Sequence, residues 1–293
     1  MRLKFAATAV ALMLLTSLAT LVVRDTFLDE AASGHGAVQT LVSTRLGEAR
    51  SYEVFLPEHY GADGNRRYPV LYVLDGQSQG EHTAASAALM ARIGIMPEVI
   101  VVGIPSGSSE TRNRDYTPAD MRIDDEEPGG ALGSADRFLG FVEEELVPAV
   151  EREYRTRRPR MLSGWSRGGL LVVYSLLTQP AFFDARFAQS PALWREDNRI
   201  IPQAVRALGA PTMKDQFLFL SLGAKENAKM TSAFNQLTAA LEQQAPPALR
   251  WRSVLSHDGD HETNPRLATP IGLCEFFAPA AAPGAAACQP RLE

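Results

Sequence analysis

A short run of glycines around one serine constrains this 293-residue chain more than any other feature. Gly164, Ser166 and Gly168 stand in the pattern Gly-Trp-Ser-Arg-Gly. A serine with glycines two residues before and after it is typical of a strand that turns sharply into a helix, where larger side chains at the flanking positions would collide. Because five residues can match by chance, the surrounding segments decide whether the serine is a nucleophile.

The surrounding segments fit that arrangement. Residues 160–163 follow Pro159 as a short extended run, and residues 169–177 form an apolar stretch long enough for a buried helix before Pro180. We therefore expect Ser166 to lie at a strand-to-helix turn with its hydroxyl available for attack on a substrate.

The composition bounds the architecture and the partners. A chain of 293 residues with 45% apolar residues can bury one sizeable core, so we expect a single domain. The formal net charge is −5, and the one group of arginines, at 155, 157, 158 and 160, is dispersed. Binding to nucleic acid through phosphate contacts is therefore not expected.

The N-terminus has the layout of an export signal. Arg2 and Lys4 precede an uncharged, largely apolar run over residues 5–23, which approaches the ~20 residues that span a bilayer. Residues 1–23 are therefore interpreted as a cleaved signal peptide or an uncleaved membrane anchor, and residues 24–36 as a linker. We expect an exported protein, either periplasmic or anchored to the membrane and facing the periplasm.

The two cysteines lie close to the C-terminus. Cys274 and Cys288 stand on either side of an Ala/Pro-rich stretch within the predicted tail, residues 279–293. In an oxidising compartment they could form a disulfide that ties the tail to the domain, and the alternative is two free thiols. Neither has a CxxC partner, so a zinc site built on them is not expected.

Hydrophobic patterning predicts alternating strands and helices over residues 37–278. Strands are expected at 38–42, 50–56, 69–74, 99–104, 160–163, 186–189, 216–222 and 249–255, and helices at 83–92, 135–154 (with a kink at Pro148), 169–177 and 231–243. The first two strands form an antiparallel pair at the edge. This order predicts an α/β fold with a doubly wound, mostly parallel sheet that binds ligands at its carboxyl edge, without a large separate cap.

A serine nucleophile needs a general base oriented by a carboxylate. In this arrangement the acid and then the base follow the serine in the chain. Of the five histidines only His257 and His261 come after Ser166, so the base is one of these two. His261 is the candidate base because it lies further beyond the last strand, with His257 as the alternative. No metal is expected, since the residues between these histidines are poor helix formers and need not place both on one face.

Glu226 is the candidate acid, because it follows the strand at 216–222. The alternatives are a surface glutamate paired with Lys229, or a role for Asp258 or Asp260 as the acid. The backbone N–H groups of Arg167 and Gln77 are the candidate oxyanion donors, one directly after the serine and one after the strand at 69–74.

Several ordered motifs together resemble the esterase D and enterochelin-esterase-like branch of the α/β hydrolases. They are Pro69-Val70-Leu71-Tyr72-Val73-Leu74-Asp75-Gly76, Arg112-Asn113-Arg114-Asp115-Tyr116-Thr117-Pro118, the turn at Ser166, Ser190-Pro191-Ala192-Leu193-Trp194 and Gly259-Asp260-His261. The resemblance implies ester hydrolysis by Ser166 and His261 without a cofactor. Some members that cleave siderophore trilactones use a Ser-His dyad, so the dyad is an alternative to the triad.

Three further residues are candidates for substrate binding. Arg112 and Arg114 follow a strand's carboxyl end, where they could receive a carboxylate or catecholate, and the alternative for Arg114 is an ion pair with Asp115 or Asp120. Trp194 could wall the substrate pocket or belong to the core. Trp165 and Arg167 depart from the His-Ser-Leu that is commoner around the serine, which predicts a more cationic pocket mouth.

These patterns predict an exported serine esterase acting on a small-molecule ester, either a siderophore ester or a short acyl ester. One alternative is an acyltransferase that passes the acyl group to an alcohol. The other is a catalytically silent binding protein on the same fold.

Overall fold

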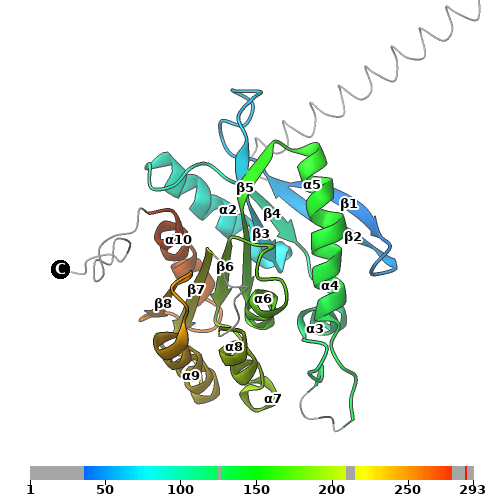
Figure 1. Ribbon diagram of the computed structural model, residues 1–293. Helices are drawn as coiled ribbons and strands as arrows, with labels where there is room; N and C mark the ends of the chain where they lie inside the picture. Colours follow the sequence, from blue (N-terminus) through cyan, green and yellow to red (C-terminus); the bar gives the residue numbers. More distant parts are fainter. Residues whose placement is uncertain (1–35, 125–126, 128, 209–214, 279–287, 289–293) are drawn as a thin grey trace, which may run out of the picture.

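The structure, a computed structural model, describes residues 36–124, 127, 129–208, 215–278 and 288. These residues form an α/β fold around one eight-stranded sheet (Figure 1). In chain order the strands are β1 Ala37–Ser43, β2 Glu48–Phe55, β3 Tyr68–Leu74, β4 Ile100–Ile104, β5 Thr156–Trp165, β6 Ala185–Gln189, β7 Gln216–Gly223 and β8 Leu249–Ser256.

The sheet runs in the order β1-β2-β4-β3-β5-β6-β7-β8. β1 pairs antiparallel with β2, and β2 pairs antiparallel with β4. From β4 to β8 all neighbouring strands are parallel. The predicted mostly parallel sheet is therefore confirmed, and the carboxyl ends of β3 to β8 meet at one edge, where a parallel sheet binds its ligands.

Helices cover both faces of the sheet (Figure 1). α2 and α10 pack against each other and against one face, and α6 packs on β5 and β6 from the other side, followed by α8 and α9. The helices are α2 Gly76–Arg92, α3 Ser109–Tyr116, α4 Ala135–Phe141, α5 Val147–Glu153, α6 Arg167–Thr178, α7 Arg195–Asn198, α8 Ile200–Leu208, α9 Ala228–Gln244 and α10 Asn264–Phe277, with a π-helical turn, η1 Val142–Leu146, between α4 and α5.

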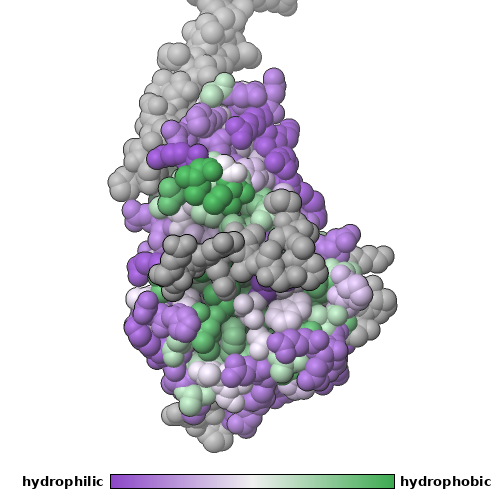
Figure 2. All heavy atoms as spheres, turned by 90° about the vertical axis from the view of Figure 1, so that its left-hand side faces the viewer, coloured by the Kyte–Doolittle hydropathy of each residue, from purple (hydrophilic) through white to green (hydrophobic). Residues whose placement is uncertain are grey.

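Alternate residues of the central strands face opposite helical layers. Tyr72 and Leu74 of β3 belong to one apolar cluster, whereas Leu71 and Val73 belong to a second cluster under α2 and α10. Because both faces are covered, β3 reads as a continuous apolar run. On the α2 and α10 side, apolar side chains are also exposed among polar ones (Figure 2).

Four helices were not predicted from the sequence: α3, α7, α8 and α10. α3 forms within a polar segment because the Ser108 side chain accepts a hydrogen bond from the N–H of Thr111 and caps the first turn. α10 carries proline in its first turn and again at Pro270, which hides its helical pattern. Where a kink was expected at Pro148, the structure has a π turn, η1, which runs directly into α5 and has Pro148 as the second residue after it.

A disulfide joins Cys274 of α10 to Cys288, which decides between the two alternatives for these cysteines. The predicted signal or anchor, residues 1–23, lies outside the described residues, as do residues 24–35 of the linker and most of the tail. Among the residues that are described, no helix has the length and apolar character needed to cross a membrane.

One fully buried arginine holds the loop that follows α6. Arg186 of β6 is 0% exposed and donates five hydrogen bonds, to the side-chain and backbone oxygens of Ser175, the backbone oxygens of Phe183 and Gln179, and the side-chain oxygen of Gln216. Burial lowers the pKa of Arg186 to about 9. These five hydrogen bonds link α6, the loop after it and the start of β7 to one buried side chain.

We predict that Arg186→Ala lowers the free energy of unfolding by about 3 kcal/mol, because it removes five hydrogen bonds and leaves a cavity in place of a fully buried side chain. Urea unfolding measures the change. Arg252→Ala is the control, since the Arg252 side chain on β8 is exposed and its ion pair with Glu275 of α10 should contribute less than ~1 kcal/mol. Equal losses in the two variants would contradict the prediction.

Candidate active site

Ser166 lies at the turn between β5 and α6, as the sequence predicted. Its backbone has φ 59° and ψ −117°, a strained conformation for a residue other than glycine. A Cβ atom at Gly164 would lie 2.5 Å from the carbonyl oxygen of Gly168, so the first glycine is sterically required. A Cβ at Gly168 would meet a carboxylate oxygen of Asp75 at 3.4 Å, which is an ordinary contact.

The structure brings Ser166, His261 and Glu226 together from three separate loops. The Nε2 atom of His261 lies 2.9 Å from the Oγ atom of Ser166, and its Nδ1 atom lies 3.0 Å from the Oε2 atom of Glu226. The Trp165 indole N–H donates to the His261 carbonyl oxygen at 2.7 Å. This arrangement can pass a proton from the serine hydroxyl to the imidazole while the carboxylate orients the ring.

The Glu226 side chain is 1% exposed. Its Oε1 atom accepts hydrogen bonds from the Ser190 hydroxyl and from the N–H of Gly223, the latter at 2.9 Å, while Oε2 faces His261. The alternative of a surface glutamate paired with Lys229 is therefore wrong. The structure places Glu226 where an orienting acid would lie.

The other histidine and carboxylates considered from the sequence lie elsewhere. His257 and Asp258 are exposed. The carboxylate of Asp260 accepts a hydrogen bond from the Thr263 hydroxyl, which lowers the pKa of Asp260. Across the described part of the chain, no group of three or more His, Cys, Asp or Glu side chains could hold a metal ion.

The two candidate oxyanion donors both lie in the first turn of a helix. Arg167 is the first residue of α6 and Gln77 the second residue of α2, so neither N–H has an acceptor within its own helix. The Gln77 side chain exchanges two hydrogen bonds with Ser106, which holds this turn against the loop after β4. The Arg167 guanidinium donates to the Thr117 hydroxyl at 2.6 Å.

Arg112 contacts the loop that carries Gln77. Its guanidinium binds both carboxylate oxygens of Asp75, at 2.7 and 2.8 Å, and donates to the Trp165 carbonyl oxygen at 3.3 Å. Burial acts to lower the pKa of Arg112, but the hydrogen bonds and charge of Asp75 outweigh it and raise that pKa overall. Asp75 itself has φ 55°. The Asp75 carboxylate, which sequence reasoning treated as part of a turn, is therefore a structural partner of this site.

The other two candidate substrate residues lie at different places. Arg114 contacts Asp115 at 2.8 Å and Glu48 at 2.7 Å, which matches the ion-pair alternative. Trp194 is half-buried, packs on the core and has the Lys229 ammonium 5.7 Å from its ring centroid. It also lines an open cavity of about 560 Å³ at the carboxyl edge of the sheet, together with Arg122, Glu196, Asp197, Asn198, Ala228, Lys229 and Ser232.

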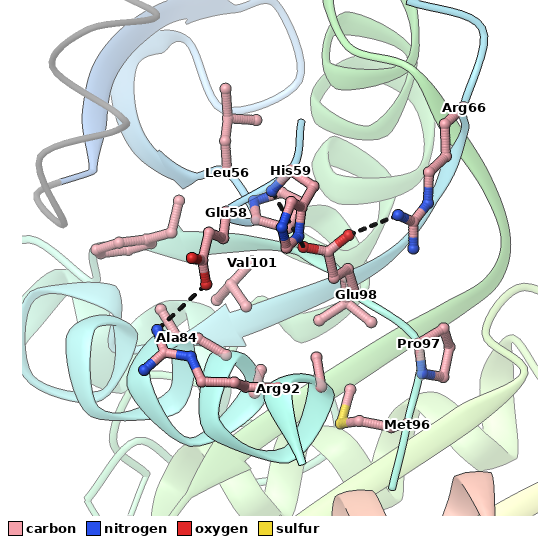
Figure 3. Close-up of a pocket in the computed structure, with 16 residues that line it drawn as sticks. Leu56, Glu58, His59, Arg66, Ala84, Arg92, Met96, Pro97, Glu98 and Val101 are labelled. Carbon is pink, nitrogen blue, oxygen red and sulfur yellow. Dashed lines mark hydrogen bonds and ion pairs between the residues drawn. The ribbon is translucent and has the colours of Figure 1, made fainter. Parts of the chain in front are cut away.

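A second cavity, of about 420 Å³, lies at the opposite end of the sheet (Figure 3). It is bordered by the residues that precede β3 and β4 and by the last turns of α2. Two ion pairs cross it, Arg66 with Glu98 at 2.8 Å and Arg92 with Glu58 at 3.2 Å. Because Ser166 follows β5 at the carboxyl edge, this cavity is not part of the candidate active site.

Known proteins share both the sequence pattern and the fold. The family model named Esterase matches residues 43–282. The ferri-bacillibactin esterase BesA of Bacillus subtilis is 33% identical over 171 residues, 54% of this chain and 59% of that protein. The siderophore enterobactin esterase of Emericella nidulans is 32% identical over 176 residues, 53% of this chain and 57% of that protein. The matches thus cover less than two thirds of the length of either relative.

Among solved structures, an IroE-like serine hydrolase from Shewanella oneidensis superposes with a TM-score of 0.75 at 27% identity. The superposition covers 82% of this chain and 79% of that chain.

We predict that Arg112→Lys slows fluorophosphonate labelling of Ser166 about tenfold, because lysine cannot bind both oxygens of Asp75 and the Gln77 turn loosens. The measurement is the second-order labelling rate. Arg114→Lys is the matched control and should stay within about twofold. The probe carries neither carboxylate nor catecholate, so an unchanged rate in Arg112→Lys would instead favour direct substrate binding by Arg112.

Proposed function

Because the chain belongs to the esterase family of the α/β hydrolases, we propose that it hydrolyses carboxylic esters through Ser166, His261 and Glu226. The observation that carries the proposal is the continuous hydrogen-bonded chain of these three side chains, at 2.9 and 3.0 Å, at the carboxyl edge of the sheet. Serine in such a chain is activated for acyl transfer.

In the proposed reaction the Ser166 Oγ atom attacks the ester carbonyl while His261 Nε2 takes its proton. The N–H groups of Arg167 and Gln77 stabilise the negative oxygen of the tetrahedral intermediate. His261 then gives the proton to the leaving alcohol, which leaves an acyl-serine. Water attacks that acyl group with His261 as base, and the carboxylic acid and Ser166 hydroxyl are released.

Siderophore esters are the substrate class that we propose first, and short acyl esters second. The names of the two curated relatives describe them as siderophore esterases. The cavity at Trp194 and Lys229 offers an aromatic wall, which supports a substrate with an aromatic group.

We predict that Ser166→Ala loses at least about 10³-fold in ester hydrolysis and all fluorophosphonate labelling, with a similar loss of hydrolysis in His261→Ala. Hydrolysis of p-nitrophenyl butyrate and of a trilactone siderophore, each with and without iron, measures the activity and ranks the two substrate classes. His257→Ala is the matched control and should keep wild-type activity. A Ser166→Ala variant that still hydrolyses these esters would overturn the proposal.

We also propose that the protein is exported, with residues 1–23 as signal peptide or membrane anchor. The basic residues before the apolar run at 5–23 support this, as does the disulfide between Cys274 and Cys288, since such bonds persist in oxidising compartments.

Expression of the full chain in a bacterial host tests export. We predict that the product appears in the periplasmic or membrane fraction with both cysteines resistant to alkylation until reduced. Mass spectrometry of the N-terminus then separates a cleaved signal from a retained anchor. A full-length product in the cytoplasm with free thiols would contradict the proposal.

A further inference from the structure

A buried chain of polar side chains continues behind Glu226, on the side away from His261. The Ser190 hydroxyl donates to Glu226, and Asn264 Nδ2 donates to Ser190 Oγ at 2.8 Å. Asn264 Nδ2 also donates to the Ser221 hydroxyl at 3.0 Å, and its Oδ1 atom accepts from the Ser256 hydroxyl at 2.6 Å. These serines and Asn264 are all buried, and they come from the ends of β6, β7, β8 and the start of α10.

The hydrogen bonds of this chain have a definite direction. Ser256 donates to the amide oxygen of Asn264, so the amide nitrogen faces Ser190 and Ser221. The Ser190 oxygen accepts from Asn264, and its own hydrogen is therefore available for Glu226. The hydrogen bonds therefore run in one direction, from Ser256 to Asn264, from Asn264 to Ser190, and from Ser190 to the Glu226 carboxylate.

The backbone is strained at Ser190, the residue whose hydroxyl donates to Glu226. Its φ is 43°, in the left-handed region, although the residue carries a side chain and precedes Pro191. Its N–H donates to the Ser221 carbonyl oxygen at 2.8 Å, which ties the strained turn to the neighbouring strand. Strain of this kind persists where the surrounding structure enforces it and is common at functional sites.

Glu226 needs these donors because it is buried. A carboxylate without hydrogen-bond donors is costly to keep charged away from water. Three donors surround it, from Ser190, Gly223 and His261. The Gly223 donor is a backbone N–H at the end of β7, whereas the Ser190 donor is a side-chain hydroxyl in the turn after β6.

We propose that Ser190 and Asn264 are positioning residues for the reaction. Asn264 orients the Ser190 hydroxyl, and that hydroxyl holds the Glu226 carboxylate aimed at His261 Nδ1. This inference rests on the proposed function, because Glu226 acts only through His261 on Ser166. It adds a second set of residues on which the orientation of the base depends.

The test compares variants of the full chain by kcat and KM on p-nitrophenyl butyrate and by the rate of fluorophosphonate labelling. Ser190→Ala and Asn264→Ala should lower kcat and the labelling rate about tenfold, as expected for loss of one hydrogen bond to a charged group. KM should stay within about twofold, since Ser190 reaches the reaction only through Glu226. Ser190→Gly should show the same loss and is the second variant, because glycine adopts a φ of 43° without strain and removes the hydroxyl without straining the backbone.

Ser221→Ala is the matched control, since Ser221 is equally buried and receives a hydrogen bond from the same Asn264 amide but does not contact Glu226 in the structure. It should keep kcat within about twofold. In a Glu226→Ala background, Ser190→Ala should cause no further loss, because residues that act through one group are not additive.

Three results would overturn the inference while leaving ester hydrolysis intact. They are wild-type kcat in both Ser190 variants, an equal loss in Ser221→Ala, and a full additional tenfold loss when Ser190→Ala is combined with Glu226→Ala. A wild-type protein that neither hydrolyses esters nor reacts with the probe would instead refute the proposed function, and the inference with it.

Discussion

The strained turn at Ser166 is the constraint on which the rest of the site depends. It ends the central strand β5, and its backbone is held from the neighbouring strand, since Ser166 N–H donates to the Gln189 carbonyl at 3.0 Å and Ala192 N–H donates to the Ser166 carbonyl at 2.9 Å. Once the serine stands at this edge, the loops after β3, β7 and β8 reach it because parallel strands place all their carboxyl ends together. The proposed oxyanion donor Gln77, acid Glu226 and base His261 therefore follow three different strands and meet around Ser166.

The acid side of the site depends on α10. This helix crosses β6, β7 and β8 and begins with Asn264, so one packing interaction both covers the sheet and delivers the amide that orients Ser190. The disulfide ties Cys274 on the same helix to Cys288, so the support behind Glu226 is linked to the C-terminal segment as well. The buried Glu226 side chain thus accepts hydrogen bonds from the end of β7 and from the turn after β6, and Asn264 of α10 donates to that turn.

Sequence patterns predicted the parts of this arrangement that rest on local physics. The glycine-flanked turn at Ser166 and the buried strands follow from short-range patterns, whereas the candidates Glu226 and His261 followed from the order of elements in this fold; the structure places all three side chains together. The supports were not predicted, because they depend on contacts between distant residues. Nothing near Arg112 in the sequence indicates that its partner is Asp75, 37 residues away. Likewise α10 was not predicted, because its prolines interrupt the sequence pattern that is typical of a helix.

Trp165 joins the two sides of the site. Its carbonyl oxygen accepts from Arg112 on the oxyanion side, while its indole N–H donates to the His261 carbonyl and its ring lies 5.0 Å from the imidazole. Both hydrogen bonds of Trp165 use groups that do not titrate in the physiological range, an indole N–H and a backbone carbonyl oxygen. The residue before the nucleophile, where histidine is commoner in similar esterases, here fixes the loop of the base directly to the end of β5. Arg112 on one side and the loop of His261 on the other are therefore hydrogen-bonded to the same residue at the end of β5.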